Sequence, residues 1–235
     1  MNQKLLLPAI AVSGIIASVA SAQTYTVPAN ANIYSAGLST PVAPAGGGAG
    51  ILPVSITLAP STTKLQFQAS GTYTFDGGYH VVGADGNSGS YSPVVLNPYG
   101  GISGYNGPGC PLVGLFLTSS PPQTPAPPTL DFTGNNEHPN FLTLSPLIGQ
   151  LFFIGDGLAD GSGATQSFNV PTGATRLFLG IADGDYYSDS PAGFYDDNTG
   201  NLTVTLSAVP EPASIALMGL GMALLLARRS DRGTP

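Results

Sequence analysis

Cysteine, histidine and charged residues are scarce in this chain. Cys110 is the only cysteine, so no internal disulfide can form, and the alternatives are a simple thiol or a bond to a second molecule. His80 and His138 are the only histidines, which excludes a three-histidine zinc site. The chain also lacks a Gly-x-Ser-x-Gly elbow and the Lys-Ser/Thr of a phosphate loop, so nothing indicates a serine hydrolase or a nucleotide-binding enzyme.

Basic residues are scarcest between residues 23 and 209. Lys64 and Arg176 stand there against eleven acidic residues, a net charge of −9. Such a surface repels phosphate backbones, and we expect no binding to nucleic acid. Charged residues are 8% of the chain, whereas Gly, Pro, Ser and Thr are abundant. This composition is typical of an exported β-protein with long turns.

The N-terminal residues have the features of a secretory signal peptide over 1–22. Lys4 precedes an apolar stretch over 5–19, and Ala20, Ser21 and Ala22 form a small-x-small cleavage site. We expect signal peptidase to cut after Ala22, which leaves Gln23 as the first residue of an exported protein.

The C-terminal residues, 209–235, predict a membrane tail. Pro210, Glu211 and Pro212 are followed by an apolar run over 213–227, which Arg228 and Arg229 end. The prolines favour extended backbone, and the run as a helix of ~1.5 Å per residue would be shorter than the roughly 30 Å hydrocarbon core. Basic residues after the span hold the C-terminus in the cytoplasm. A permanent anchor and a buried core helix are the alternatives.

This tail resembles the PEP-CTERM sorting signal of exosortase substrates. The resemblance implies a Gram-negative-type bacterium, transient anchoring in the inner membrane and cleavage by an exosortase near Pro210-Glu211-Pro212. The released protein would then reach the cell surface or the extracellular exopolysaccharide matrix.

Residues 23–54 are rich in Ala, Gly and Pro and predict an arm, with an edge strand near Ile33 and Tyr34 at most. Residues 55–208 predict an all-β domain, a β-sandwich or jelly roll, because period-two segments alternate with Gly, Pro, Asp and Asn clusters. The eight expected strands are 55–58, 65–69, 72–75, 112–117, 150–154, 166–170, 176–181 and 201–206.

Acidic residues gather in one loop near the C-terminal end of this domain. Five of them fall within fifteen residues: Asp183, Asp185, Asp189, Asp196 and Asp197. Crowded carboxylates repel one another unless solvent separates them or a cation joins them. Ca²⁺ takes six to eight oxygen ligands, but the spacing is not that of an EF-hand. The alternatives are a Ca²⁺ site and a solvated acidic loop.

Residues 56–207 resemble a calcium-dependent galactose-binding bacterial lectin, a small jelly roll. The likeness rests on residues 176–183 and 197–205, whereas the loop between them is longer here and the lectin's sugar-reading histidine has no clear counterpart. The resemblance implies Ca²⁺ ligands from the side chains of Asp183, Asp197 and Asn198, from the carbonyls of Phe194 and Phe75, and a sugar contact from Asp85.

We therefore expect a non-enzymatic surface or matrix protein that binds glycan through Ca²⁺. One alternative is a purely structural envelope component without a small-molecule ligand. The other is a secreted glycan-active hydrolase, because the acidic loop contains enough carboxylates for the pair that a glycosidase needs.

The tail gives a direct prediction. If an exosortase removes it, mass spectrometry of the exported protein should find no peptide that contains Arg228 and Arg229. The same peptide should be present in protein from cells that lack the exosortase. Its presence in the exported protein would contradict the expected cleavage.

Overall fold

The computed structural model describes residues 22–87, 93–133, 139–159, 163–184 and 191–209. Strands dominate this part of the chain, and its only two named helices are the short 3-10 turns η1 (Ile33–Ser35) and η3 (Tyr195–Asp197). An all-β fold is therefore confirmed. Within these ranges no helix is long and apolar enough to cross a membrane. The predicted sorting helix lies outside the described residues, as does the signal peptide except Ala22.

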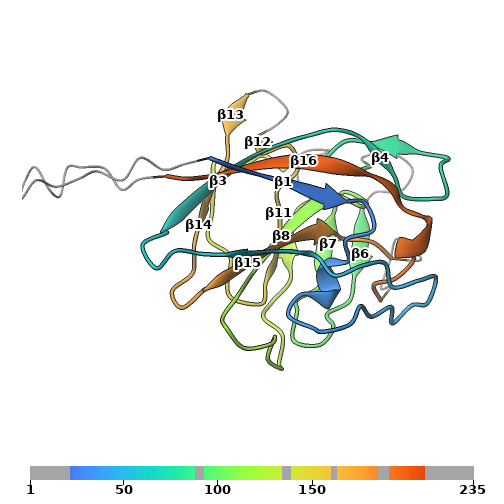
Figure 1. Ribbon diagram of the computed structural model, residues 1–235, viewed down its shortest axis with the longest axis horizontal. Coiled ribbons are helices and arrows are strands. Elements are labelled where there is room, and N and C mark those ends of the chain that lie inside the picture. The colour runs from blue at the N-terminus through green and yellow to red at the C-terminus, as the bar shows by residue number, and fades with distance from the viewer. Residues whose placement is uncertain (1–21, 88–92, 134–138, 160–162, 185–190, 210–235) are drawn as a thin grey trace, which may run out of the picture.

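Two sheets form the body of the molecule, one above the other in Figure 1. The seven-stranded sheet contains β1 (Gln23–Pro28), β3 (Lys64–Ser70), β4 (Tyr73–Thr74), β5 (Val81–Val82), β10 (Thr143–Leu144), β14 (Ser167–Asn169) and β16 (Thr199–Ala208). Its order is β10-β14-β3-β16-β4-β5, with β1 also paired to β16. The four-stranded sheet runs β11 (Leu151–Phe153), β8 (Leu112–Leu117), β15 (Arg176–Ile181), β2 (Val54–Thr57).

Alternation along β16 explains how the seven-stranded sheet faces the core. Successive side chains of a strand point to opposite faces. Leu202, Val204 and Leu206 are buried, whereas Thr203, Thr205 and Ser207 face outward. The buried set packs with Phe67 of β3 and with Leu177 and Leu179 of β15 in one cluster. The two sheets thus share a hydrophobic core.

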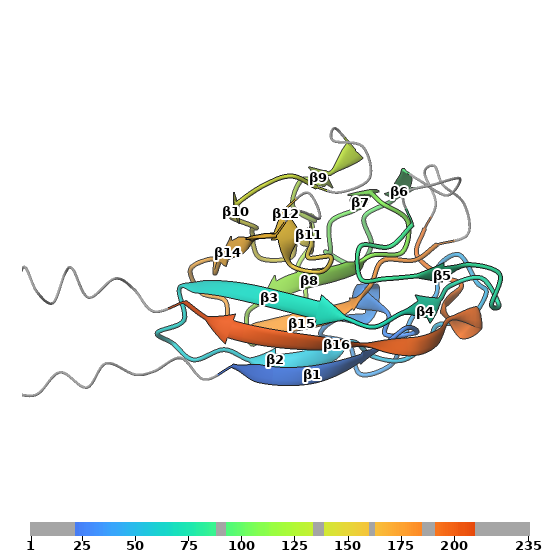
Figure 2. The same ribbon diagram turned by 90° about the horizontal axis from the view of Figure 1, so that it is seen from above.

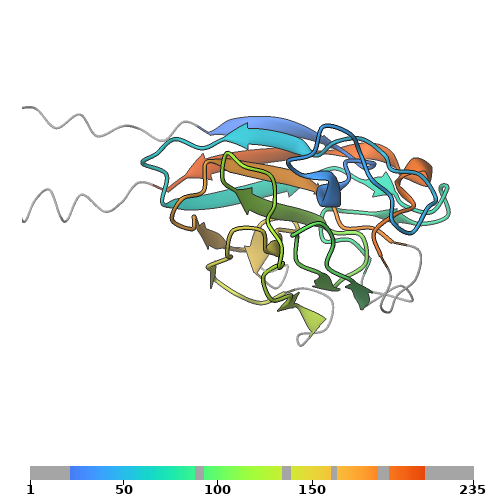
Figure 3. The ribbon, with the colours of Figure 1, turned by 90° about the horizontal axis from the view of Figure 1, so that it is seen from below.

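β8 is buried along its whole length because both of its faces are covered. Leu112 and Phe116 belong to the core between the sheets, and Val113 and Leu115 belong to a second cluster on the other face. η1, β6 (Val94–Leu96) and β7 (Tyr105–Gly107) contribute to this side, which Figure 3 shows from below. β9 (Leu130–Asp131) pairs with β7, and its Leu130 packs against the first cluster. The hairpin of β12 (Leu158–Ala159) and β13 (Ala164–Thr165) stands beside β3.

The eight expected strands are all present, with bounds shifted by a few residues at most. Residues 23–54, for which the sequence predicts an arm, differ from that expectation. β1 pairs with β16 in register from Gln23↔Leu206 to Pro28↔Asn201, and Ile33 and Tyr34 form the buried η1 rather than an edge strand. Burial of these side chains supplies the free energy that fixes the segment.

β1 and β16 bring the two ends of the described chain together. The blue start of β1 and the red end of β16 lie at the same end of the sheet in Figure 2. The amide of Val209 donates to the carbonyl of Lys64 at 2.9 Å, so the pairing of β16 with β3 persists to the last described residue.

Two neighbouring residues of β16 test this description of the core. Leu202 is fully buried, and Leu202→Ala should lower the free energy of unfolding by ~2–5 kcal/mol through lost burial and a residual cavity. The exposed Thr203 is the matched control, and Thr203→Ala should change it by at most ~0.5 kcal/mol. Denaturant unfolding of the exported protein measures both, and equal effects would contradict the assigned faces.

Candidate metal site

The loop between β15 and β16 crosses from one sheet to the other, and its two ends are bonded together. Asp183 follows β15 and Asn198 immediately precedes β16. The Asn198 amide nitrogen donates to the Asp183 Oδ2 atom at 2.9 Å and to the carbonyl of Ala29 at 3.1 Å. The buried side chain of Asn198 thus connects the start of β16 to the end of β15 and to the segment that follows β1.

Asp183 lies in a closed environment, with only 3% of its surface exposed. Its Oδ1 atom accepts from the Gly184 amide at 2.7 Å and from the Cys110 thiol at 3.1 Å. Burial raises the pKa of the Asp183 carboxyl to about 7, and the charge of Asp197 adds to this rise, while the hydrogen bonds oppose it. Burial also raises the pKa of the Cys110 thiol, which is therefore a structural donor.

Two oxygens of this loop lack a hydrogen-bond donor. The Oδ1 atoms of Asp197 and Asn198 are both buried, and neither has a partner among the described residues. Burial first, and then the charges of Asp76 and Asp196, raise the pKa of Asp197. An unsatisfied buried acceptor costs ~1–3 kcal/mol, more if it is charged. A bound cation would satisfy both of these neighbouring acceptor oxygens, so Asp197 and Asn198 fit a cation site.

Of the two backbone positions expected as ligands, Phe194 lies in this loop and Phe75 lies in a turn that contacts it. Phe194 has a left-handed backbone with φ of 65°, and its amide donates to the carbonyl of Gly46 at 3.0 Å. Phe75 begins the turn in which the Gly77 amide donates to the Asp197 carbonyl at 3.3 Å. The structure thus places the expected ligands on three segments that touch one another.

The glycine run at 46–48 supports the loop, a role that the sequence analysis missed. A side chain on Gly47 would come within 2.3 Å of the Phe194 ring, and one on Gly48 within 2.0 Å of the Asp196 carboxyl carbon. The Gly48 carbonyl also accepts from the amide of Tyr195. Only glycine permits this approach, so three glycines in succession were the available signal.

The remaining acidic residues play other roles or lie outside the described ranges. Asp85, the expected sugar contact, accepts the amide of Asp156 through Oδ1 at 2.9 Å and so fastens the turn before β12. Asp76 accepts the amide of His80 at 2.8 Å and also contacts its ring. Asp185 and Asp189 lie outside the described residues.

The donor set favours a hard cation. Across the described ranges, no three His, Cys, Asp or Glu side chains converge in a way that could hold a metal. The oxygens that the loop offers here are those of two Asp side chains, one Asn side chain and backbone carbonyls, which are ligands typical of Ca²⁺ rather than of Zn²⁺. The side chain of Arg176, at the start of β15, donates to the carbonyls of Thr118 and Ser120 and not to the described acidic residues of the loop.

A recognised motif begins where the sheet ends. Residues 208–230 match the PEP-CTERM protein-sorting motif. The chain carries an exosortase sorting signal. The PEP-CTERM motif implies an exported protein with an exosortase as its processing partner, which confirms that part of the sequence prediction. Neither a curated protein nor a solved structure matches the chain, so the likeness to the galactose-binding lectin gains no support.

The raised pKa of Asp183 predicts how stability depends on pH without metal. Its pKa is about 7 in the folded protein against an ordinary 3.8, so the folded state holds an extra proton between these values. The stabilisation that comes from the protonated carboxyl is complete below about pH 4. The free energy of unfolding then falls as the pH rises to about 7, by at most ~1.4 kcal/mol per pH unit. Denaturant unfolding in EDTA should show this loss.

Asp183→Asn should remove that component, because the amide does not titrate. The matched control is Asp131→Asn, whose exposed carboxyl has a pKa that hydrogen bonds from Thr133 lower rather than raise, so this variant should keep the fall in stability. An unchanged slope in Asp183→Asn would show that another group titrates.

Proposed function

We propose that this exported protein is non-enzymatic and binds Ca²⁺ at the loop between β15 and β16, and that the bound ion attaches it to glycan of the cell surface or exopolysaccharide matrix. One observation carries the proposal. Among the described residues, the buried Oδ1 atoms of Asp197 and Asn198 have no donor, and the amide nitrogen of Asn198 bonds to the buried carboxylate of Asp183. A cation supplies what these oxygens lack.

The chain offers five oxygen sources for the ion. Three are the side chains of Asp183, Asp197 and Asn198, and two are the carbonyls of Phe75 and Phe194, as the lectin-like resemblance and the jelly roll imply. Ca²⁺ takes six to eight ligands, so further positions stay open to water or to sugar hydroxyls. When bound, the ion would neutralise the repulsion among the carboxylates and polarise the hydroxyls that complete its shell.

A purely structural role is the second candidate, and Asp183 favours it. Both of its carboxylate oxygens already accept hydrogen bonds, and Asn198 connects it to Ala29 without any metal. In that case the site only joins the sheets. Retention on immobilised exopolysaccharide with Ca²⁺, and release by EDTA, would favour the glycan-binding role. Turnover of a glycan panel that depends on Asp183 or Asp197 would instead favour a hydrolase.

Thermal melting tests the cation site directly. Ca²⁺ at 100 times its dissociation constant should stabilise the folded protein by about 2.7 kcal/mol, which raises the melting temperature by roughly 5–10 °C over that in EDTA. Asp197→Ala should abolish most of this shift, because it removes an oxygen that has no other partner.

Asp196→Ala is the control for that experiment. Asp196 is exposed and its Oδ1 atom accepts from the Gly50 amide at 3.1 Å, so this variant should keep the Ca²⁺ shift. The absence of a shift in the unaltered protein would reject the site. An equal shift in both variants would place the ion elsewhere.

A further inference from the structure

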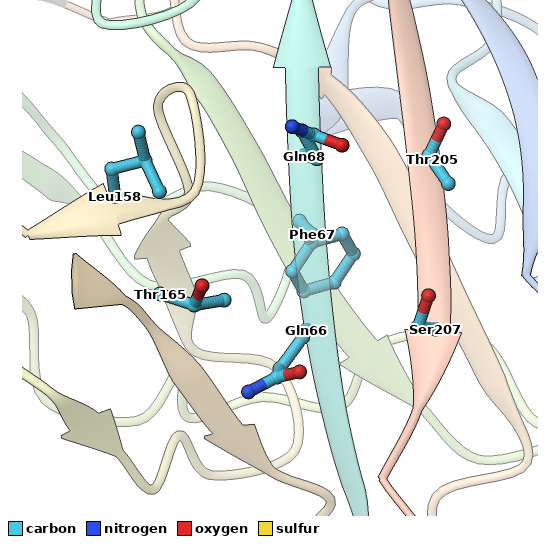
Figure 4. Close-up of a pocket in the computed structure, with 7 residues that line it drawn as sticks. All are labelled: Gln66, Phe67, Gln68, Leu158, Thr165, Thr205 and Ser207. Carbon is cyan, nitrogen blue, oxygen red and sulfur yellow. The ribbon is translucent and has the colours of Figure 1, made fainter. Parts of the chain in front are cut away.

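A polar groove lies on the outer face of the seven-stranded sheet. It has a volume of about 200 Å³ and is lined by Gln66, Phe67, Gln68, Leu158, Thr165, Thr205 and Ser207. Figure 4 shows the side chains of β3 and β16 along its floor, with Leu158 of β12 and Thr165 of β13 at one side. None of these residues belongs to the candidate metal site.

The floor of the groove is a regular array of uncharged hydrogen-bonding groups. Gln66 pairs with Ser207 and Gln68 with Thr205 in the antiparallel register, so each row presents an amide beside a hydroxyl. Thr24 of β1 extends the second row, with its Oγ1 atom 3.3 Å from that of Thr205. Amides and hydroxyls each donate and accept, so every row offers both functions to a ligand.

The side of the groove is held firmly against β3. Gly157, just before β12, lies so close to the Phe67 carbonyl that an added Cβ would be 2.0 Å from its oxygen. The Asp156 carbonyl also accepts from the amide of Ala69 at 3.0 Å, and the Gly157 carbonyl accepts from that of Gln166 at 2.9 Å. These contacts fix the β12–β13 hairpin beside the floor, so the groove is formed before any ligand binds.

We propose that this groove binds a chain of neutral polysaccharide without the help of a cation. Sugar hydroxyls donate and accept like the groups of the floor, and the apolar Leu158 offers a surface for the C–H faces of a sugar ring. A charged polymer would find no opposite charge among the lining residues, and acidic polymers are also repelled by the net charge of −9 over residues 23–209.

This inference does not rest on the proposed cation site, and the two are separable by chelation. The groove uses the middle and end of β16, whereas the metal loop precedes its first residue, Thr199. Binding through the groove should therefore persist in EDTA, and groove variants should keep the thermal shift caused by Ca²⁺.

Affinity electrophoresis of the exported protein in EDTA tests the proposal. Native gels would contain galactomannan, dextran or hydroxyethyl cellulose as neutral probes, and alginate as the acidic probe. At least one neutral probe should retard the protein and alginate should not. Gln68→Ala combined with Thr205→Ala should weaken the retardation about tenfold, because two hydrogen-bonding groups are lost from one row.

The control is Thr26→Ala, an exposed substitution on β1 outside the groove, which should leave retardation unchanged. Melting temperatures within a few degrees of the unaltered protein establish that the variants are folded. The proposal is overturned if no neutral probe retards the protein in EDTA, or if the double variant is retarded as strongly as the control. Retardation seen only with Ca²⁺ would also overturn it and would assign glycan binding to the metal loop.

Discussion

The hydrogen bond from Asn198 to Asp183 is the contact on which the arrangement of the loop depends. It joins the end of a strand in one sheet to the start of a strand in the other, and the same amide holds the backbone at Ala29. Because these groups are buried, losing one partner would leave the other unsatisfied at a cost of ~1–3 kcal/mol or more. The bond therefore fixes the ends of the acidic loop and keeps its carboxylates together.

Much of the β framework was predictable because it follows from local alternation. β3 and β16 each expose one face to solvent, so polar and apolar residues alternate along them, and β8 and β15 read as continuous apolar runs. The short strands β6, β7 and β9 were not predicted, because they lie among Gly- and Pro-rich residues. What holds them is contact with distant parts of the chain, namely the second hydrophobic cluster for β6 and β7 and the first for β9, and no local pattern encodes it.

The sequence indicated the two ends of the acidic loop, but not the segment that supports it. Asp183 and Asp197 stood out in an acidic cluster between two strands, and the lectin-like resemblance added Asn198, which the structure bonds to Asp183. The glycines at 46–48 signalled a close approach of some kind, but residues 46–50 lie far away in sequence, so no local pattern identified Phe194 and Asp196 as their partners. The turn contact of Asp85, which accepts the amide of Asp156 from a distant segment, was likewise not encoded by any local pattern.

The pairing of β1 with β16 sets the order in which an exported chain can fold. β16 lies between β1 and β3 and ends at Ala208, where the sorting motif begins. β1 cannot pair until β16 has crossed the membrane, because β16 is its partner and lies at the other end of the domain. Closure of the sheet therefore requires delivery of the segment that directly precedes the sorting motif.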